Sequence, residues 1–201
     1  MALPSHVAPD LTPISPGFIK PCLPCVALLP PKGEQWLHKI KHPGHRLIVR
    51  RDGSGIRLFA EQGEEWTSSF PHLVEAVGLL PVKSCILDGE LVGSGEQGDP
   101  VSGPPADGAT EASAAFYAFD LIEVNSFDLR RDRIEERKRA LAHLLRKAPP
   151  PIRLNPQFEF GGETLLRQVC RMGFEGVLSK RRGSRYLSGR CPDWILSRPL
   201  D

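Results

Sequence analysis

The sequence has 201 residues, 40% of them hydrophobic, and its 26 Lys and Arg against 24 Asp and Glu give a formal net charge of +2. This length and composition suit one globular domain with a buried core, and the small net charge does not by itself indicate nucleic-acid binding. There is no apolar run of roughly 20 residues and no signal-peptide pattern, so we expect a cytoplasmic protein without membrane contact.

The first third of the chain predicts a proline-rich start followed by antiparallel strands. Residues 1–16 have no periodicity and are expected to be flexible, and residues 17–31 are expected to form an extended arm on the surface. Strands are predicted over three ranges, 34–41, 45–51 and 56–63. Pro43-Gly44 is expected to form the turn between the first two strands.

The middle third predicts two helices and two strands around a loop. The predicted elements are a helix over 71–80, a strand over 84–92, a glycine- and proline-rich loop over 93–113, and the most apolar strand over 114–124. Asp132 and Glu135 have the spacing of a capping box at the start of a second helix. Its buried stripe is predicted to be Ile134, Leu141, Leu144, Leu145 and Ala148, with the basic residues, Arg137 among them, on a solvated face.

The last third predicts a short strand and turn over 152–160, a helix over 162–172, and strands over 174–180 and 193–198. Because strands and helices do not alternate strictly, we expect an α+β fold in which antiparallel sheets are flanked by helices. Cys22 and Cys25 are spaced as a Cys-x-x-Cys pair, but no second pair completes a zinc site, so reduced thiols are expected.

Lys41 is the candidate nucleophile. The period of two in the strand over 34–41 places Lys39 and Lys41 on one face, while Leu37 and Ile40 anchor the segment. Desolvation and a neighbouring cation would both lower a lysine pKa and raise the fraction of reactive neutral amine. Considered alone, the same segment is equally consistent with a surface hairpin that carries solvated lysines.

Five motifs occur in an order that resembles the adenylation domain of ATP-dependent DNA ligases, most closely the bacterial repair type. A lysine motif matches Lys41, Gly44 and Arg46, and an acidic strand motif matches Asp88-Gly89-Glu90. The remaining three matches lie further along the chain, at Phe116-Tyr117-Ala118-Phe119-Asp120, at Glu175-Gly176-Val177-Leu178-Ser179-Lys180, and at Ser184-x-Tyr186-x-x-Gly189-Arg190 with Trp194. The resemblance covers about residues 18–198 and implies the ATP-grasp-like nucleotidyltransferase fold of these ligases.

The resemblance also implies a reaction and a role for each matched residue. Lys41 would attack the α-phosphate of ATP to form a lysine–AMP intermediate, and the nucleotide would then pass to a DNA 5′-phosphate during strand joining in repair or recombination. Glu90 and Glu175 would bind Mg²⁺. The residues implied to contact ATP are Lys39, Ile40, Arg46, Glu90, Phe119, Lys180 and Arg198, with Phe119 stacking on adenine and Lys180 neutralising phosphate.

The chain departs from the family pattern at several positions. Pro43 replaces the aspartate of the lysine motif, and Lys39 replaces a glutamate of close relatives. Leu196 and Arg198 stand where the family has two lysines. Loss of one charge-stabilising donor typically costs on the order of 100- to 1,000-fold in rate.

These departures leave three functional hypotheses open. The first is a ligase-type adenylyltransferase that uses ATP, Mg²⁺ and nicked DNA. The second is a non-catalytic relic or accessory module that binds nucleotide or DNA. The third is an RNA ligase or capping-type relative. We expect residues 17–201 to be the adenylation domain without the OB-fold domain that usually follows, so a separate OB-fold partner chain is a further hypothesis.

Overall fold

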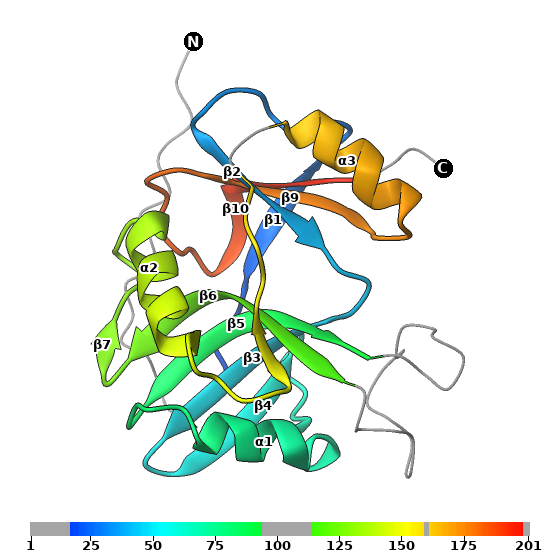
Figure 1. The fold of residues 1–201 in the computed structure, drawn as a ribbon. Helices are drawn as coiled ribbons and strands as arrows, with labels where there is room; N and C mark the ends of the chain where they lie inside the picture. Colours follow the sequence, from blue (N-terminus) through cyan, green and yellow to red (C-terminus); the bar gives the residue numbers. More distant parts are fainter. Residues whose placement is uncertain (1–16, 94–113, 159–160, 199–201) are drawn as a thin grey trace.

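The computed structural model describes residues 17–93, 114–158 and 161–198, which form two β-sheets stacked face to face (Figure 1). The upper sheet of this view has the order β1-β10-β9-β2, with strands Cys22–Ala27, Gly189–Ser197, Gly176–Arg181 and Trp36–Lys41. The lower sheet has the order β4-β3-β5-β6-β7, with strands Gly55–Ala60, His45–Asp52, Cys85–Val92, Ala115–Val124 and Phe127–Asp128. A short strand, β8 (Ile152–Leu154), pairs with β6.

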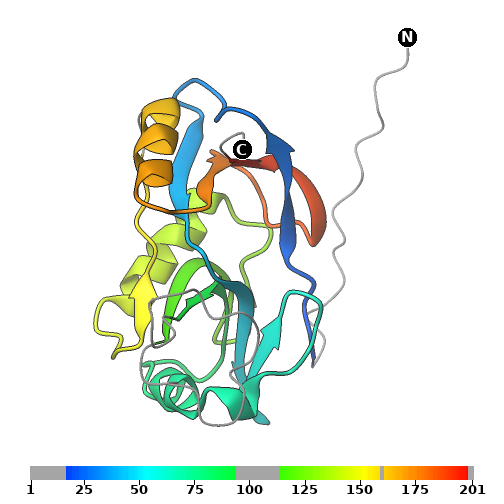
Figure 2. The same cartoon turned by 90° about the vertical axis from the view of Figure 1, so that its right-hand side faces the viewer.

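The helices lie on the outer faces of the two sheets. Helix α1 (Pro71–Gly78), which follows a 3-10 turn at Thr67–Ser69, and helix α2 (Ile134–Leu145) pack in one core with the lower sheet. Helix α3 (Gly162–Arg171) packs against the upper sheet through Leu165, Leu166 and Val169, and it lies at the opposite end of the molecule from α1 (Figure 2). Among the described residues no helix is long and apolar enough to cross a membrane.

The central strands of the lower sheet supply both of its cores because their side chains alternate between the two faces. Leu47 and Val49 of β3 face α1 and α2, whereas Ile48 between them faces the upper sheet. Strand β5 repeats the division, with Leu87 in the outer core and Ile86 in the core between the sheets. The layer between the sheets therefore receives every second side chain of these strands, and the charged residues of the site lie in that register.

The predicted α+β class is confirmed, and the strands and helices over 34–51, 71–80, 84–92 and 114–124 agree with the observed bounds to within two residues. The prediction that residues 17–31 lie on the surface as an arm is wrong. Its central part is β1, which pairs in parallel with β10 and buries Cys22 completely. The predicted flexible start and most of the predicted loop over 93–113 lie outside the described residues.

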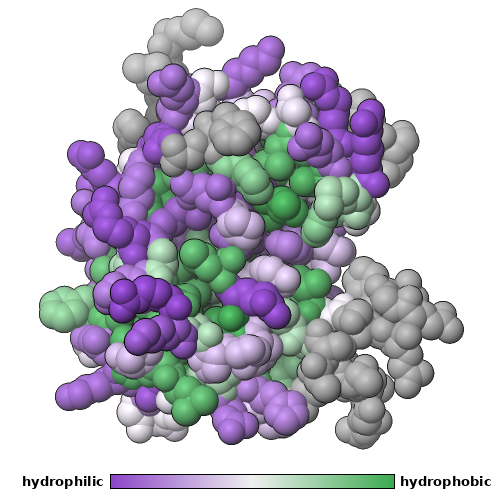
Figure 3. Space-filling model, in the orientation of Figure 1, coloured by the Kyte–Doolittle hydropathy of each residue, from purple (hydrophilic) through white to green (hydrophobic). Residues whose placement is uncertain are grey.

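The predicted capping box at Asp132 and Glu135 is also wrong, because α2 begins at Ile134 with Arg133 as its N-cap. The backbone N–H of Arg133 donates to the carboxylate of Glu136, three residues further on, at 3.1 Å. Glu135 instead accepts from the backbone N–H of Gly183 at 3.1 Å, which ties α2 to the loop before β10. Hydrophilic side chains cover α2 on the face seen in Figure 3, as the predicted solvated face requires.

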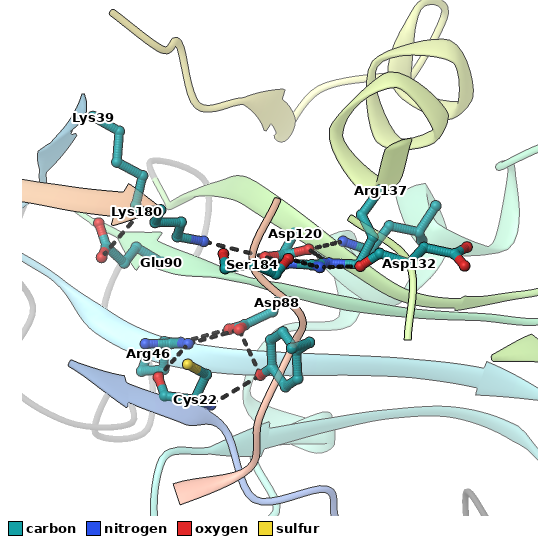
Figure 4. A network of polar contacts seen from close by, with 12 residues as sticks. Cys22, Lys39, Arg46, Asp88, Glu90, Asp120, Asp132, Arg137, Lys180 and Ser184 are labelled. Carbon is teal, nitrogen blue, oxygen red and sulfur yellow. Dashed lines mark hydrogen bonds and ion pairs between the residues drawn. The ribbon is translucent and has the colours of Figure 1, made fainter. Parts of the chain in front are cut away.

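Arg137 is the exception to that solvated face, since its side chain is completely buried. Its guanidinium donates to both carboxylate oxygens of Asp120 on β6, at 2.8 and 3.1 Å, and to the carbonyl oxygen of Ser184 at 3.0 Å (Figure 4). A planar donor fork matches a carboxylate in this two-point geometry. Arg137 thus fixes α2 to β6 and to the loop that leads into β10.

We expect Arg137→Met to lower the free energy of unfolding by about 3 kcal/mol, because it leaves the buried Asp120 carboxylate without its main partner. Urea unfolding followed by circular dichroism measures this change. Arg139→Met on the same helix is the matched control, since Arg139 is exposed and its replacement should change stability by less than about 0.5 kcal/mol. A loss below about 1 kcal/mol for Arg137→Met would contradict the assigned role.

Candidate active site

A cavity of about 840 Å³ opens between the two sheets. Its charged wall contains Lys41 at the end of β2, Arg46 on β3, Glu90 on β5, and Glu175 directly before β9. Apolar residues of the upper sheet, β1 included, also line the cavity: Leu23, Pro24, Val26, Leu178 and Leu196. Such a cleft suits a ligand with one polyanionic and one apolar part.

The Lys41 ammonium lies between two carboxylates. Its Nζ is 3.2 Å from Glu175 and 3.5 Å from Glu90, and it donates to the carbonyl oxygen of His42 at 2.8 Å. The side chain keeps 17% exposure, so Lys41 remains accessible from the cavity. Close packing fixes Glu175 here, because a Cβ on Gly176, the next residue, would come within 2.2 Å of the Ser197 carbonyl oxygen on β10.

Glu90 links the two lysines of β2. Its carboxylate lies 3.9 Å from Lys39 and 3.5 Å from Lys41, and it accepts the backbone N–H of His42 at 3.1 Å. Burial acts to raise the pKa of Glu90, but the nearby cations, Lys39 first, outweigh burial and lower the pKa, so the carboxylate is ionised. The preceding Gly89 is required by packing, since a Cβ there would lie 2.4 Å from the ring of Phe116.

Arg46 reaches the cavity from a fixed position. It donates to both oxygens of Asp88, at 2.5 and 2.6 Å, and to the carbonyl oxygen of Cys22 in β1 at 3.2 Å (Figure 4). Asp88 also accepts the Tyr186 hydroxyl at 2.7 Å. Burial opposes the charge of Arg46, yet the Asp88 carboxylate keeps the pKa of Arg46 above its usual value. Arg46 therefore ties the two sheets together at the cavity wall.

Lys180 lies behind the cavity, 1% exposed. Its Nζ is 3.2 Å from Asp120 and 3.3 Å from the centroid of the Trp194 ring. Burial lowers the pKa of Lys180 to about 7, although the Asp120 carboxylate acts in the opposite direction. Arg137, Asp120 and Lys180 thus form one buried row of charges (Figure 4).

Phe119 and Lys39 also lie behind the cavity wall. Phe119 has no exposed surface, and the Nζ of Lys39 lies 3.3 Å from the centroid of its ring. Ile40 is partly buried and packs beside α3, and its carbonyl oxygen accepts from Asn155 at 3.4 Å.

The structure therefore divides the predicted site residues into two groups. Lys41, Arg46, Glu90, Glu175 and Arg198 line the cavity, and Arg198 lies 3.7 Å from Glu175. Lys39, Phe119 and Lys180 are buried behind them, whereas Ile40 lies on the other face of β2, beside α3.

Several residues of this region were not predicted. Glu61, Glu64 and Trp66, which follow β4, line the cavity, and nothing in their sequence pattern indicated it. For Asp120 the sequence did give a signal, because an aspartate within the most apolar strand needs a buried cation as its partner. The sequence did not show that this partner is Arg137.

The sequence model of the family described as "ATP dependent DNA ligase domain" matches residues 26–195. The chain is 36% identical over 185 residues to a multifunctional non-homologous end joining protein LigD of Pseudomonas aeruginosa, covering 90% of this chain and 22% of that protein. LigD of Mycobacterium tuberculosis is 30% identical over 167 residues, which is 82% of this chain and 22% of that protein. The chain thus spans about a fifth of these curated relatives.

Solved structures give the same picture. The mycobacterial DNA ligase D complexed with ATP and MES matches with a TM-score of 0.75 and 26% identity, over 91% of this chain and 61% of that one. The ligase domain of LigD from M. tuberculosis matches with a TM-score of 0.74 and 26% identity, over 90% of this chain and 60% of that one. The two stacked sheets are therefore the fold of DNA ligase nucleotidyltransferase domains.

We expect Lys180 to contribute a rise in the free energy of unfolding between pH 7 and pH 10, and Lys180→Met to remove this contribution. Folded Lys180 loses its proton near pH 7, whereas the unfolded chain keeps it until about pH 10.5, so the unfolded state binds more protons across this interval and raising the pH favours the folded state. Urea titrations at several pH values measure the effect. Lys147→Met, at an exposed lysine, should keep the wild-type rise, and an unchanged rise in Lys180→Met would contradict the prediction.

Proposed function

Since the chain belongs to the family of ATP-dependent DNA ligase domains, we propose that it transfers the adenylyl group of ATP through a covalent lysine–AMP intermediate on Lys41. The observation that carries this proposal is the position of the Lys41 ammonium at the cavity, between Glu90 and Glu175. The DNA ligase relatives cover 80–90% of this chain, which supports ATP as the nucleotide and a DNA strand break as the final substrate.

The proposed first step needs a neutral amine. Lys41 would give a proton to water in the cavity, and its Nζ would then form a bond to the α-phosphorus. The bond from that phosphorus to the pyrophosphate oxygen would break, and pyrophosphate would leave with the bonding electron pair. Such a reaction depends on in-line positioning and on charge stabilisation more than on bond-making groups.

The carboxylates of Glu90 and Glu175 also fit a magnesium site. Among the described residues no group of three or more His, Cys, Asp or Glu is arranged to hold a metal ion. Mg²⁺, however, usually takes one or two carboxylates and completes its shell with water and substrate phosphates. When bound, the ion would neutralise phosphate charge, and its attraction for the two carboxylates would weaken their hold on the Lys41 proton.

The remaining charged residues of the cavity would position the phosphates. Arg46 is held by Asp88, and Arg198 by Glu175, so each presents its guanidinium from a supported position. We infer that Arg46 contacts the ribose–phosphate part and that Arg198 contacts the outer phosphates. Lys180, behind the wall, would add positive potential when it is protonated.

A non-catalytic nucleotide- or DNA-binding module is the second candidate function, and specific residues favour it. Pro43 lacks both the carboxylate and the N–H that an aspartate would supply beside Lys41. Leu196, in the lining of the cavity, offers no charge to a phosphate. In this alternative the fold and the cleft are retained, whereas covalent transfer is lost.

We expect the wild-type chain with Mg²⁺ and ATP labelled at the α-phosphate to retain label through denaturing electrophoresis, and Lys41→Arg to reduce the label to background. Arginine keeps the positive charge but is not deprotonated at neutral pH, so it cannot act as the nucleophile. Lys147→Arg should label like the wild type. If the wild type carries no label while a known ligase is labelled in parallel, adenylyl transfer is excluded and the binding module remains.

We expect Leu196→Lys to increase the rate of labelling about 10- to 100-fold, because it places a cation in the lining of the cavity, where it can approach a phosphate. Val26→Lys is the matched control, since Val26 is the β1 partner of Leu196 and lines the same cavity. Single-turnover labelling measures both rates. An equal gain in the two variants would show that added positive charge, rather than position 196, is responsible, and no gain would contradict the prediction.

A further inference from the structure

We propose that Lys39 occupies the nucleotide-base site of this chain: its side chain lies on the ring face of Phe119 on which a base would stack, and it must leave that face before a nucleotide binds. The proposal rests on the proposed function in that the ligand of the cleft is a nucleotide, and on the expectation from the family resemblance that its base stacks on Phe119. It makes Lys39 a residue that sets nucleotide affinity, in addition to the residues that line the cavity.

The first observation is that Phe119 has no free face. The Lys39 Nζ lies 3.3 Å from its ring centroid, the Lys180 Nζ 4.3 Å, and the Arg46 guanidinium carbon 4.7 Å. The ring itself is completely buried. A base needs a ring face at van der Waals distance in order to stack, so at least one of these cations has to move.

Of the three cations, Lys39 is the one the protein holds least. Arg46 forms two hydrogen bonds with Asp88, and Lys180 forms one with Asp120. Lys39 is 1% exposed, its Nζ has no hydrogen-bond partner among the described residues, and the nearest oxygen of Glu90 lies 3.9 Å from it. An ammonium group in this state forfeits hydration without regaining it from the protein. Arg46 and Lys180, which are hydrogen-bonded, therefore stay in place, and Lys39 is the cation that moves toward the cavity, where its ammonium group regains water.

The space that Lys39 fills adjoins the cavity. The Glu90 oxygen nearest to Lys39, 3.9 Å away, also lies 3.5 Å from Lys41, and both Glu90 and Lys41 line the cavity wall. Figure 4 shows the Lys39 side chain extending toward Glu90 and Lys180 in the layer between the sheets. Removing the side chain beyond its Cβ would join this space to the cleft and uncover the ring beside Lys41.

The chemistry of the ring explains why a lysine can stay there in the free protein. The face of a phenyl ring is electron-rich, so it attracts a cation and repels a carboxylate. The glutamate that the family resemblance places at position 39 would therefore avoid the ring face and leave it open. The lysine of this chain covers it.

The test is isothermal titration calorimetry with AMP, which carries the base but lacks the pyrophosphate needed for transfer to Lys41. We expect Lys39→Ala to bind AMP at least about tenfold more tightly than the wild type, a ratio that corresponds to 1.4 kcal/mol. Lys39→Met removes the charge but keeps a long side chain over the ring, so its affinity should stay within about threefold of the wild type. Lys147→Ala is the exposed control.

A second measurement needs no substitution at position 39. Reductive methylation followed by peptide mass mapping should leave Lys39 of the wild type unmodified in the free protein and modify it at saturating AMP, because the base displaces it toward water. Lys147 should be modified equally in both conditions. This measurement decides the question if Lys39→Ala does not fold.

Two results would overturn the proposal: a folded Lys39→Ala that binds AMP no more tightly than the wild type, or a Lys39 that stays unmodified at saturating AMP. A third result, an equal gain in AMP affinity in Lys39→Met and Lys39→Ala, would also overturn it, since the size of the side chain at position 39 would then not be what closes the site. These outcomes are separate from the proposed function, because covalent labelling of Lys41 by ATP does not depend on whether AMP binds more tightly to the variants.

Discussion

The structure depends on a layer of paired charges buried between two β-sheets. Asp88, Glu90 and Asp120 project from neighbouring strands of the lower sheet, and each is matched by cations, chiefly Arg46, Lys41 and Arg137. Buried carboxylates without such partners would cost several kcal/mol each. Because the partners come from β2, β3 and α2, satisfying these charges also fixes how the sheets and the helix meet, so the same contacts that hold the fold together form the charged wall of the cleft.

The pattern of apolar and polar residues was enough to predict individual strands. Alternation predicted the strands on both sides of the Pro43-Gly44 turn, and the apolar run over 114–124 predicted the central strand. Two of the wrong predictions, those for β1 and Arg137, have one physical cause. β1 is a strand only because β10, at the other end of the chain, pairs with it, and Arg137 is buried only because Asp120 lies beneath it. A sequence window contains neither partner.

The order of the motifs in the sequence indicated which residues belong to the candidate site, although the spacing between them does not show that they lie close together. Lys41, Glu90 and Glu175 are far apart in the sequence, yet each of the two carboxylates lies within 3.5 Å of the Lys41 ammonium. The order of the motifs did not predict how deeply each side chain is buried. Lys180 shares a motif with Glu175 and Leu178, which line the cavity, but it lies behind the cavity, as Phe119 does. Side-chain alternation and the close packing of the sheets decide which residue reaches the cavity surface.

The departures from the family pattern act together on the charge available to a phosphate. Position 196 has lost a cation at the cavity wall and position 39 has gained one, so the number of cations is unchanged, but the added lysine lies on Phe119 rather than in the cleft. The cations that do line the cleft, Lys41, Arg46 and Arg198, are each paired with a carboxylate of the protein. A triphosphate must therefore compete with Asp88 and Glu175 for them. The divalent cation proposed above, bound to both the phosphates and Glu175, would remove that competition at one of these points, and it would then matter more here than in a cleft with unpaired lysines.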